Sequence, residues 1–281
     1  MKLLLIYPPF CTPTVLPYSL ASLKHFLKTN CELEVDVLDL NAEFHKRRFP
    51  EIYKAVKETN AKDAYAKIFE QFDKESRDLY ARNNKGVVHG QAPDLFKELF
   101  SLIKIKDYDI IACSLVYNSQ CFYGAAILKE LQAQGVTSII GGPAAKGKVL
   151  EYGKLLKNEQ EILDYFKEQG VKRKQGDFYA LDNPLDFSCF PEENYLSKER
   201  ILPIKTSSTC FYKQCTFCTH FAKVPYKEYE IEWIETTLKK NHAKYAFLIV
   251  DMIAKERLLS FAEICKALEI EWACQLRPTS D

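Results

Sequence analysis

The sequence predicts an α/β fold in two parts, and three observations lead to this prediction. Short apolar runs alternate with segments of helical period through residues 1–170, a pattern typical of βαβ units and a parallel sheet. The same alternation resumes after residue 200, beyond a stretch rich in proline and turn formers. A chain of 281 residues, 47% of them hydrophobic, is long enough to form two cores.

The first part, residues 1–180, is predicted to be a Rossmann-like, more narrowly flavodoxin-like, parallel sheet. Apolar runs bounded by turn formers predict strands at 2–7, 32–40, 108–116, 137–142 and a short fifth at 149–153. Helical periodicity predicts helices at 16–28, 120–134 and 158–169.

A helical insertion is predicted at 41–106. Apolar side chains such as Ile52, Val56 and Phe72 recur there at helical spacing, but the stretch is rich in charge, so we expect it to form a solvated surface. We expect its helices to break near "NNKGVVHGQAPD", where glycines and a proline interrupt the pattern.

The second part follows a linker at 181–200 and occupies residues 201–281. Strands are predicted at 201–208, 245–252 and 271–276, and helices at 231–240 and 255–268. This (βα) pattern runs directly from the first of these strands into a cysteine-rich loop.

The net charge and the N-terminal sequence argue against binding to nucleic acid or membranes and against secretion. The net charge of +1, from 39 basic and 38 acidic residues, provides no field that would attract nucleic acid or an anionic membrane. The opening "MKLLLIYPPF" has too short an apolar run for a signal peptide or a membrane span. We therefore expect a cytoplasmic protein whose ten cysteines serve in packing or as metal ligands.

The segment "TCFYKQCTFCTH", residues 209–220, places Cys210, Cys215 and Cys218 close together. Three thiolates can hold three irons of a cubane iron–sulfur cluster and leave one iron open, as catalysis requires. The alternative is zinc bound by these cysteines and His220, although structural zinc sites usually have two separated ligand pairs.

At these residues the sequence resembles the radical S-adenosylmethionine (SAM) enzymes, and more narrowly their cobalamin-binding branch. An aromatic residue precedes the last cysteine in that family, as Phe217 does here. The resemblance extends to the linker, "PLDFSCFPEENYLSKERILPIKTSSTC", to "FLIVDM" and to "SIIGGP". One departure is the spacing, because four residues rather than the commonest three separate Cys210 from Cys215.

The resemblance implies a 4Fe–4S cluster on the three cysteines, with SAM on the open iron, and reductive cleavage of SAM to a 5′-deoxyadenosyl radical. It implies a (β/α)6 barrel, Phe217 beside the adenine of SAM, and an external reductant. Asp251, Gln275 and Arg277 end later barrel strands and are the candidates for polar contacts to SAM. Methyl transfer or a radical rearrangement on a small molecule or peptide would fit.

Candidate ligand-binding residues also follow the strands of the first part, because an open parallel sheet binds ligands beyond its carboxyl ends. They are Pro9, Ser114, Tyr117, Asn118, Gly141 and Gly142. The glycine pair would let a bulky ligand approach the backbone closely, or would simply form a tight turn. The resemblance implies cobalamin here, but no histidine lies in the Asp-x-His-x-x-Gly motif by which many cobalamin proteins ligate cobalt.

The segment from Cys210 to Asp281 is long enough for only about half of a six-step barrel. We therefore expect residues 201–281 to be the N-terminal half of that barrel, in a truncated and incompletely active chain. A rival hypothesis from another functional class is a non-catalytic protein, zinc-stabilised or free of cofactor, that binds a ligand or partner.

Overall fold

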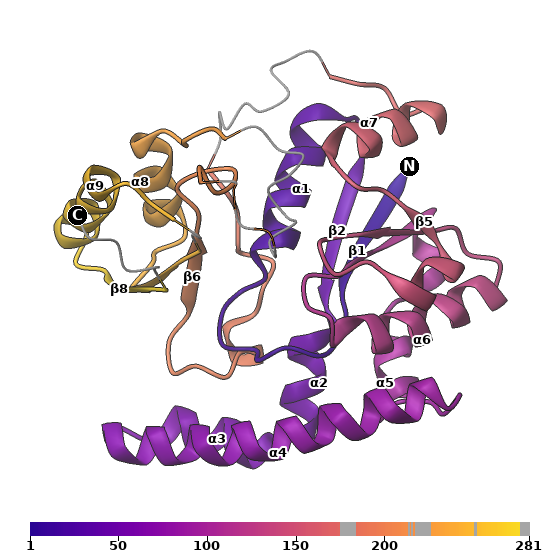
Figure 1. Cartoon of the computed structure of the whole chain (residues 1–281), viewed down its shortest axis with the longest axis horizontal. Coiled ribbons are helices and arrows are strands. Elements are labelled where there is room, and N and C mark those ends of the chain that lie inside the picture. The colour runs from indigo at the N-terminus through magenta and orange to yellow at the C-terminus, as the bar shows by residue number, and fades with distance from the viewer. Residues whose placement is uncertain (175–183, 213, 215, 217–225, 250–251, 276–281) are drawn as a thin grey trace.

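The computed structural model describes residues 1–174, 184–212, 214, 216, 226–249 and 252–275. Within these ranges the chain forms two parallel sheets with helices packed against them (Figure 1). No helix in the described part of the chain is both long and apolar enough to cross a membrane.

The first sheet has five strands in the order β2-β1-β3-β4-β5, all parallel. They are β1 (Lys2–Tyr7), β2 (Glu34–Asp39), β3 (Ile110–Ser114), β4 (Ser138–Gly141) and β5 (Lys154–Leu155). Doubly wound α/β sheets use this order, in which the winding reverses between β1 and β3. The parallel sheet predicted from the sequence is confirmed.

Successive side chains of β1 enter two different cores, which explains its nearly continuous apolar sequence. Leu3 and Leu5 pack toward α1 (Tyr18–Asn30) and α7 (Glu159–Glu168). Leu4 and Ile6 pack on the opposite face with α6 (Gln120–Ala133) and with the helices of the insertion. The sheet is therefore buried on both faces.

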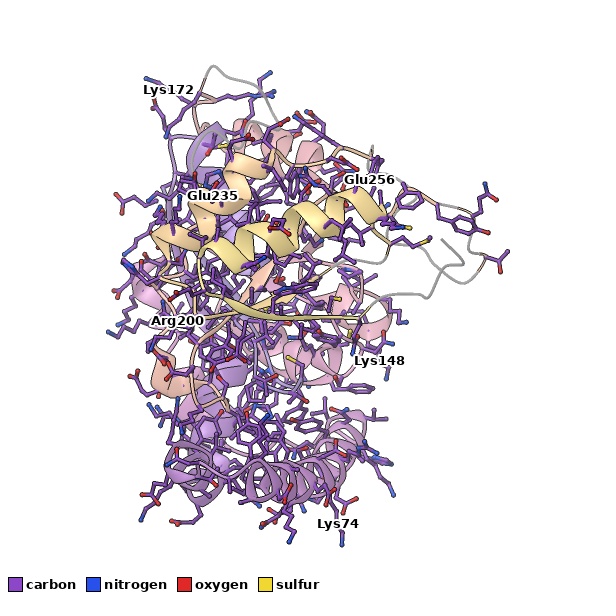
Figure 2. All side chains as sticks on the ribbon, turned by 90° about the vertical axis from the view of Figure 1, so that its left-hand side faces the viewer. Lys74, Lys148, Lys172, Arg200, Glu235 and Glu256 are labelled. Atoms are coloured by element: carbon purple, nitrogen blue, oxygen red, sulfur yellow. The ribbon has the colours of Figure 1, made fainter. Side chains whose placement is uncertain are left out.

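The insertion consists of α2 (Leu40–Arg48), α3 (Pro50–Glu58), α4 (Lys62–Val88) and α5 (Phe96–Ser101). The expectation of a solvated surface holds for charged side chains such as Lys74, but Phe44, Phe72 and Leu99 are almost fully buried in the second core. Its charged side chains occupy the outer face, as Lys74 does in Figure 2. The insertion thus covers one face of the sheet.

One predicted boundary is confirmed and another is corrected. A single glycine costs a helix only about 1 kcal/mol, so α4 passes through Gly86 and ends at Val88, within the segment where the helices were expected to break. The predicted strand at 149–153 is instead a 3-10 turn, Gly147–Tyr152, followed by β5, which pairs with β4. The turn buries Val149 against the second core, a contact that the local sequence does not reveal.

The second sheet has the order β6-β7-β8, with parallel strands at Ile201–Ile204, Tyr245–Leu248 and Glu271–Cys274. Helices α8 (Ile231–Lys240) and α9 (Lys255–Ala267) cover one face. Leu202 and Leu248 pack there against Ile234 and Phe261. Side chains such as Glu235 and Glu256 project from the outer side of these helices (Figure 2).

The described part of the linker is ordered and shares the core of both sheets. Phe187, Phe190 and Leu196 are almost completely buried. The side chain of Asn241 fixes the entry of the linker, since it accepts from the backbone N–H of Phe187 (2.9 Å) and donates to the carbonyl of Leu185 (2.9 Å). The linker therefore positions one sheet against the other.

Candidate functional site

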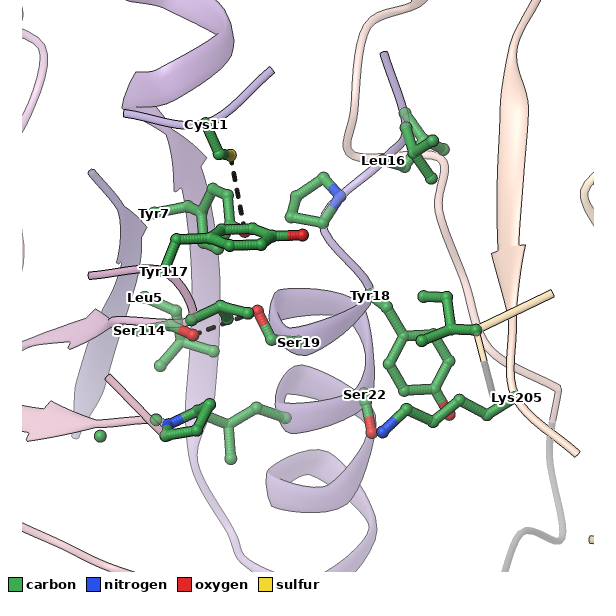
Figure 3. A pocket seen from close by; sticks show the side chains of 18 of the residues that line it. Leu5, Tyr7, Cys11, Leu16, Tyr18, Ser19, Ser22, Ser114, Tyr117 and Lys205 are labelled. Atoms are coloured by element: carbon green, nitrogen blue, oxygen red, sulfur yellow. Dashed lines mark hydrogen bonds between the residues drawn. The ribbon is translucent and has the colours of Figure 1, made fainter. Parts of the chain in front are cut away.

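A cavity of about 1510 Å³ lies between the carboxyl edge of the first sheet and the second sheet (Figure 3). Its walls come from the loops after β1, β3 and β4, from α1, and from residues of all three strands of the second sheet. This is the point where the winding of the first sheet reverses, the usual ligand site of a doubly wound sheet. Its volume exceeds the range of about 300–1,000 Å³ that is typical of small-molecule pockets.

A buried glutamine holds the two central loops of the first sheet together. Gln120 is fully buried, and its Oε1 accepts from the backbone N–H groups of Val116 (2.8 Å) and Tyr117 (2.9 Å). Its Nε2 donates to the carbonyl of Pro8, at 2.8 Å. One side chain therefore satisfies polar groups of the loops after both β1 and β3 and fixes their separation.

The two consecutive glycines at the end of β4, Gly141 and Gly142, differ in whether the fold requires a glycine. Gly142 has φ +104°, and a Cβ there would lie 2.2 Å from the carbonyl oxygen of Leu115. The fold itself therefore requires this glycine. A Cβ at Gly141 would be 3.6 Å from the nearest other atom, the carbonyl oxygen of Leu156, which is an ordinary contact. Both residues line the cavity.

A polar cluster lines the cavity near the ends of β1 and β2. The thiol of Cys11 donates to Tyr7 Oη (3.7 Å), and its backbone N–H donates to Asn41 Oδ1 (2.9 Å). Burial, assisted by the charge of Asp39, raises the pKa of the Cys11 thiol to about 12. Burial also raises the pKa of Asp39 to about 6. Cys11 is thus a neutral thiol at physiological pH.

The opposite wall combines aromatic hydroxyls with a cation. Lys205 directly follows β6, and its Nζ lies 5.4 Å from the ring centroid of Tyr18 on α1. Ser22 of α1 also lines the cavity (Figure 3). Tyr229 lines the same wall, and burial raises its pKa to about 12. This wall can supply hydrogen bonds and a positive charge to a bound ligand.

The base of the cysteine loop is closed by backbone pairing. The N–H of Tyr229 donates to the carbonyl of Thr206, and the N–H of Ser208 donates to the carbonyl of Lys227, both at 2.9 Å. Cys210 follows this base and is buried, while the preceding residue, Thr209, lines the cavity. The loop therefore begins at the cavity wall.

The structure brings four predicted residues of the first sheet together at the cavity: Ser114, Tyr117, Gly141 and Gly142. Gln275, which follows β8, also lines it. Pro9 is buried and Asn118 is exposed, and neither is part of the cavity wall. The predicted positions Cys215, Phe217, Cys218, Asp251 and Arg277 lie outside the described residues, as does His220 of the zinc alternative.

Several residues that line the cavity were not predicted from the sequence. Asp39 ends β2 and Lys205 follows β6, so the rule that ligands bind at strand ends could have found them. Tyr80 gives no such signal. It lies on α4 and contributes to the cavity by stacking on Phe10, with ring centroids 4.6 Å apart.

No group of three or more potential metal-ligating side chains occurs among the residues that the structure describes. Of the three loop cysteines, only Cys210 belongs to that part of the chain. Comparisons with protein-family models, with curated proteins and with solved structures find no match to this chain.

Proposed function

We propose that the chain is a cobalamin-linked radical SAM protein that binds a 4Fe–4S cluster and SAM. The observation that carries the proposal is the placement of a large cavity between the sheet edge and the start of the cysteine loop. A cofactor bound at the sheet edge would then face a cluster held by the loop. The resemblance seen in the sequence supports the same arrangement.

The cavity fits a cofactor of the size of cobalamin in two respects. Its volume of about 1510 Å³ leaves room for a bulky ligand. Gly141 leaves open space that a side chain would fill, although the packing of the protein does not require a glycine there. Ser114, Tyr117 and Gly141 would then hold the cofactor at the edge of the sheet. Cobalamin would supply methyl transfer or radical rearrangement chemistry.

Cys210, Cys215 and Cys218 would ligate the cluster, which would supply the electron that cleaves SAM. The buried position of Cys210 at the loop base is compatible with a ligand shielded from solvent. Residues assigned to SAM are Phe217, Asp251, Gln275 and Arg277, of which Gln275 lines the described cavity. A separate reductant and a small-molecule or peptide substrate complete the proposal.

Metal and sulfide analysis of protein purified without oxygen tests the cluster. We expect iron and sulfide in the parent chain and a sharp loss of iron in Cys210→Ala, Cys215→Ala and Cys218→Ala, because a three-thiolate site has no spare protein ligand. Cys265→Ala is the control, since Cys265 is buried in the core. Zinc without sulfide, or equal iron in all four variants, contradicts the proposal.

Cobalamin binding is tested separately by titration with hydroxocobalamin, monitored by its absorbance. Gly141→Val places a side chain in the cavity and should weaken binding by about tenfold or more. Asn118→Ala is the control, because Asn118 is exposed and is not one of the residues that line the cavity. Absence of binding by the parent chain contradicts the cobalamin part of the proposal.

A further inference from the structure

Asp39 occupies a position shared by the cavity and the linker. It ends β2, lines the cavity and caps α2, where its Oδ1 accepts from the N–H of Ala42 at 2.9 Å. Its Oδ2 accepts from the hydroxyl of Tyr195 in the linker, at 2.8 Å. One carboxylate thus joins the edge of the first sheet to a residue far away in the sequence.

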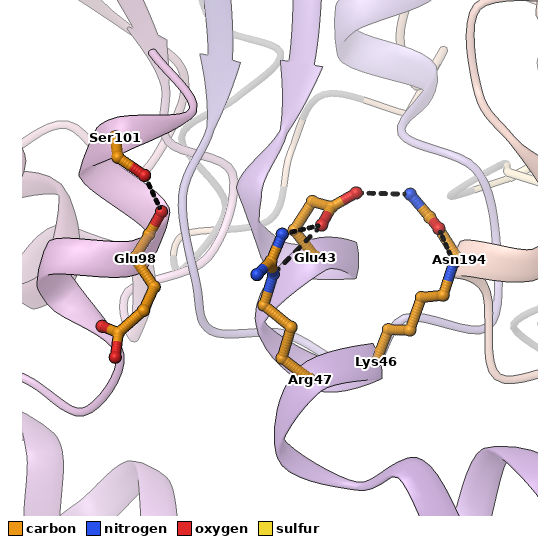
Figure 4. A network of polar contacts seen from close by, with 6 residues as sticks. All are labelled: Glu43, Lys46, Arg47, Glu98, Ser101 and Asn194. Atoms are coloured by element: carbon orange, nitrogen blue, oxygen red, sulfur yellow. Dashed lines mark hydrogen bonds and ion pairs between the residues drawn. The ribbon is translucent and has the colours of Figure 1, made fainter.

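The linker residues around Tyr195 are held by further contacts, and we call Asn194, Tyr195 and Leu196 the linker anchor. All three are buried. The side chain of Asn194 accepts from Lys46 Nζ (2.7 Å) and donates to Glu43 Oε1 (2.8 Å), as Figure 4 shows.

Backbone groups of the linker anchor are fixed as well. Tyr53 Oη of α3 donates to the carbonyl of Asn194 at 3.1 Å. The N–H of Leu196 donates to the carbonyl of Pro13 at 2.8 Å. Pro13 lies between Thr12 and Thr14, which both line the cavity. The linker anchor therefore contacts both the insertion and the cavity loop after β1.

The second sheet begins immediately beyond these contacts, since β6 starts at Ile201. A shift of the linker anchor would move the start of β6 and hence Lys205 and Thr209, which form part of the opposite wall of the cavity. In addition to covering the first sheet, the insertion is hydrogen-bonded to the linker from which the second wall extends.

We infer that Asp39 is a positioning residue, which through Tyr195 fixes the second sheet at the separation from the first that shapes the cavity. The inference deepens the proposed function, because the same cavity is the proposed cobalamin site. The hydrogen bond between Asp39 and Tyr195 would thus couple the two walls of the cavity. A ligand that displaces the loop after β1 would also move the linker, because Pro13 of that loop is bonded to Leu196.

Tyr195→Phe is the direct test, because it removes the hydroxyl and keeps the ring. Tyr108→Phe is a matched control. Tyr108 Oη also donates to an aspartate of β2, Asp36, at 3.1 Å, but neither residue lines the cavity. The measurement is amide hydrogen exchange followed by mass spectrometry on the full chain.

We expect Tyr195→Phe to raise exchange about fivefold or more in residues 8–16 and 196–204, as loss of a buried hydrogen bond implies. Exchange in β3 should stay unchanged, and Tyr108→Phe should leave both segments protected. Unchanged exchange in Tyr195→Phe, or an equal rise throughout β3, would overturn the inference, since the latter indicates only general destabilisation.

Titration with hydroxocobalamin provides a second measurement. We expect Tyr195→Phe to weaken binding about fivefold relative to the parent, and Tyr108→Phe to leave binding unchanged. Equal affinities in the parent and Tyr195→Phe would contradict the coupling. If the parent does not bind cobalamin, the proposed function fails, and the exchange experiment alone decides the positioning role of Asp39.

Discussion

The two sheets border the same cavity but secure their loops by different means. In the first sheet, buried side chains help to hold the loops, with Gln120 joining the loops after β1 and β3, and Asp39 joining β2 to the linker. In the second sheet, backbone pairing between 206–208 and 227–229 closes the loop that carries Cys210.

This difference determines which substitutions each wall can tolerate. A backbone hydrogen bond survives most changes of side chain, whereas a buried side chain that bridges two loops has no substitute. The first wall should therefore depend on the identity of a few residues. The second should depend mainly on the path of its backbone.

The largest effect is expected at Gly142. Gly142→Ala forces a side chain against the carbonyl oxygen of Leu115 at a φ of +104°, and should reduce the free energy of unfolding by about 3 kcal/mol or more. Gly141→Ala is the matched control, with an expected loss below about 1 kcal/mol. Urea denaturation measures both, and similar losses in the two variants would show that the close approach of Gly142 to Leu115 does not limit the side chain at residue 142.

Gln120→Leu should have the next largest effect. It leaves the N–H groups of Val116 and Tyr117 and the carbonyl of Pro8 without their partner, and should cost about 2–3 kcal/mol. Gln134→Leu, at the exposed end of α6, should change the free energy of unfolding by less than about 0.5 kcal/mol. A difference below about 1 kcal/mol between the two variants would contradict the bridging role of Gln120.

The raised pKa of Asp39, a residue of the first wall, predicts that the free energy of unfolding depends on pH. Its pKa of about 6 in the fold exceeds the ordinary 3.8, so the folded state binds the proton more tightly. Its contribution to stability is complete below the ordinary pKa and is lost as pH rises through about 6. Relative to Asp39→Asn, the free energy of unfolding of the wild type should fall by about 1.5 kcal/mol between about pH 5 and about pH 8. Urea denaturation at several pH values measures it, and an equal change with pH in both proteins would contradict the prediction.

The smallest effect is expected in the second wall. Ser208→Ala removes the acceptor of the Lys227 N–H, at 2.9 Å, and leaves both backbone bonds at the loop base. The free energy of unfolding should fall by about 0.5 kcal/mol. Iron content should equal that of the parent. A loss as large as that of Gln120→Leu would show that side chains secure this wall as well.

The order of strands and helices could be predicted because its signals are local. Apolar runs and helical periods specify β1, β3 and α6 within a few residues. The prediction was incomplete or wrong where burial depends on distant partners. The insertion has the solvated charges that were expected, but it also covers a sheet face with Phe44 and Phe72, and the residues before β5, predicted to be a strand, form a 3-10 helix around the buried Val149.

By itself, the sequence determined the alternation of strands and helices, the close spacing of the three loop cysteines and the glycine pair, because each depends on residues near one another in the chain. Only the tertiary structure decided which of the two glycines the fold requires, that Gln120 bridges two loops and that Asp39 meets Tyr195. Each of these contacts joins segments far apart in the sequence. Their geometry exists only after the chain has packed, and no local periodicity encodes it.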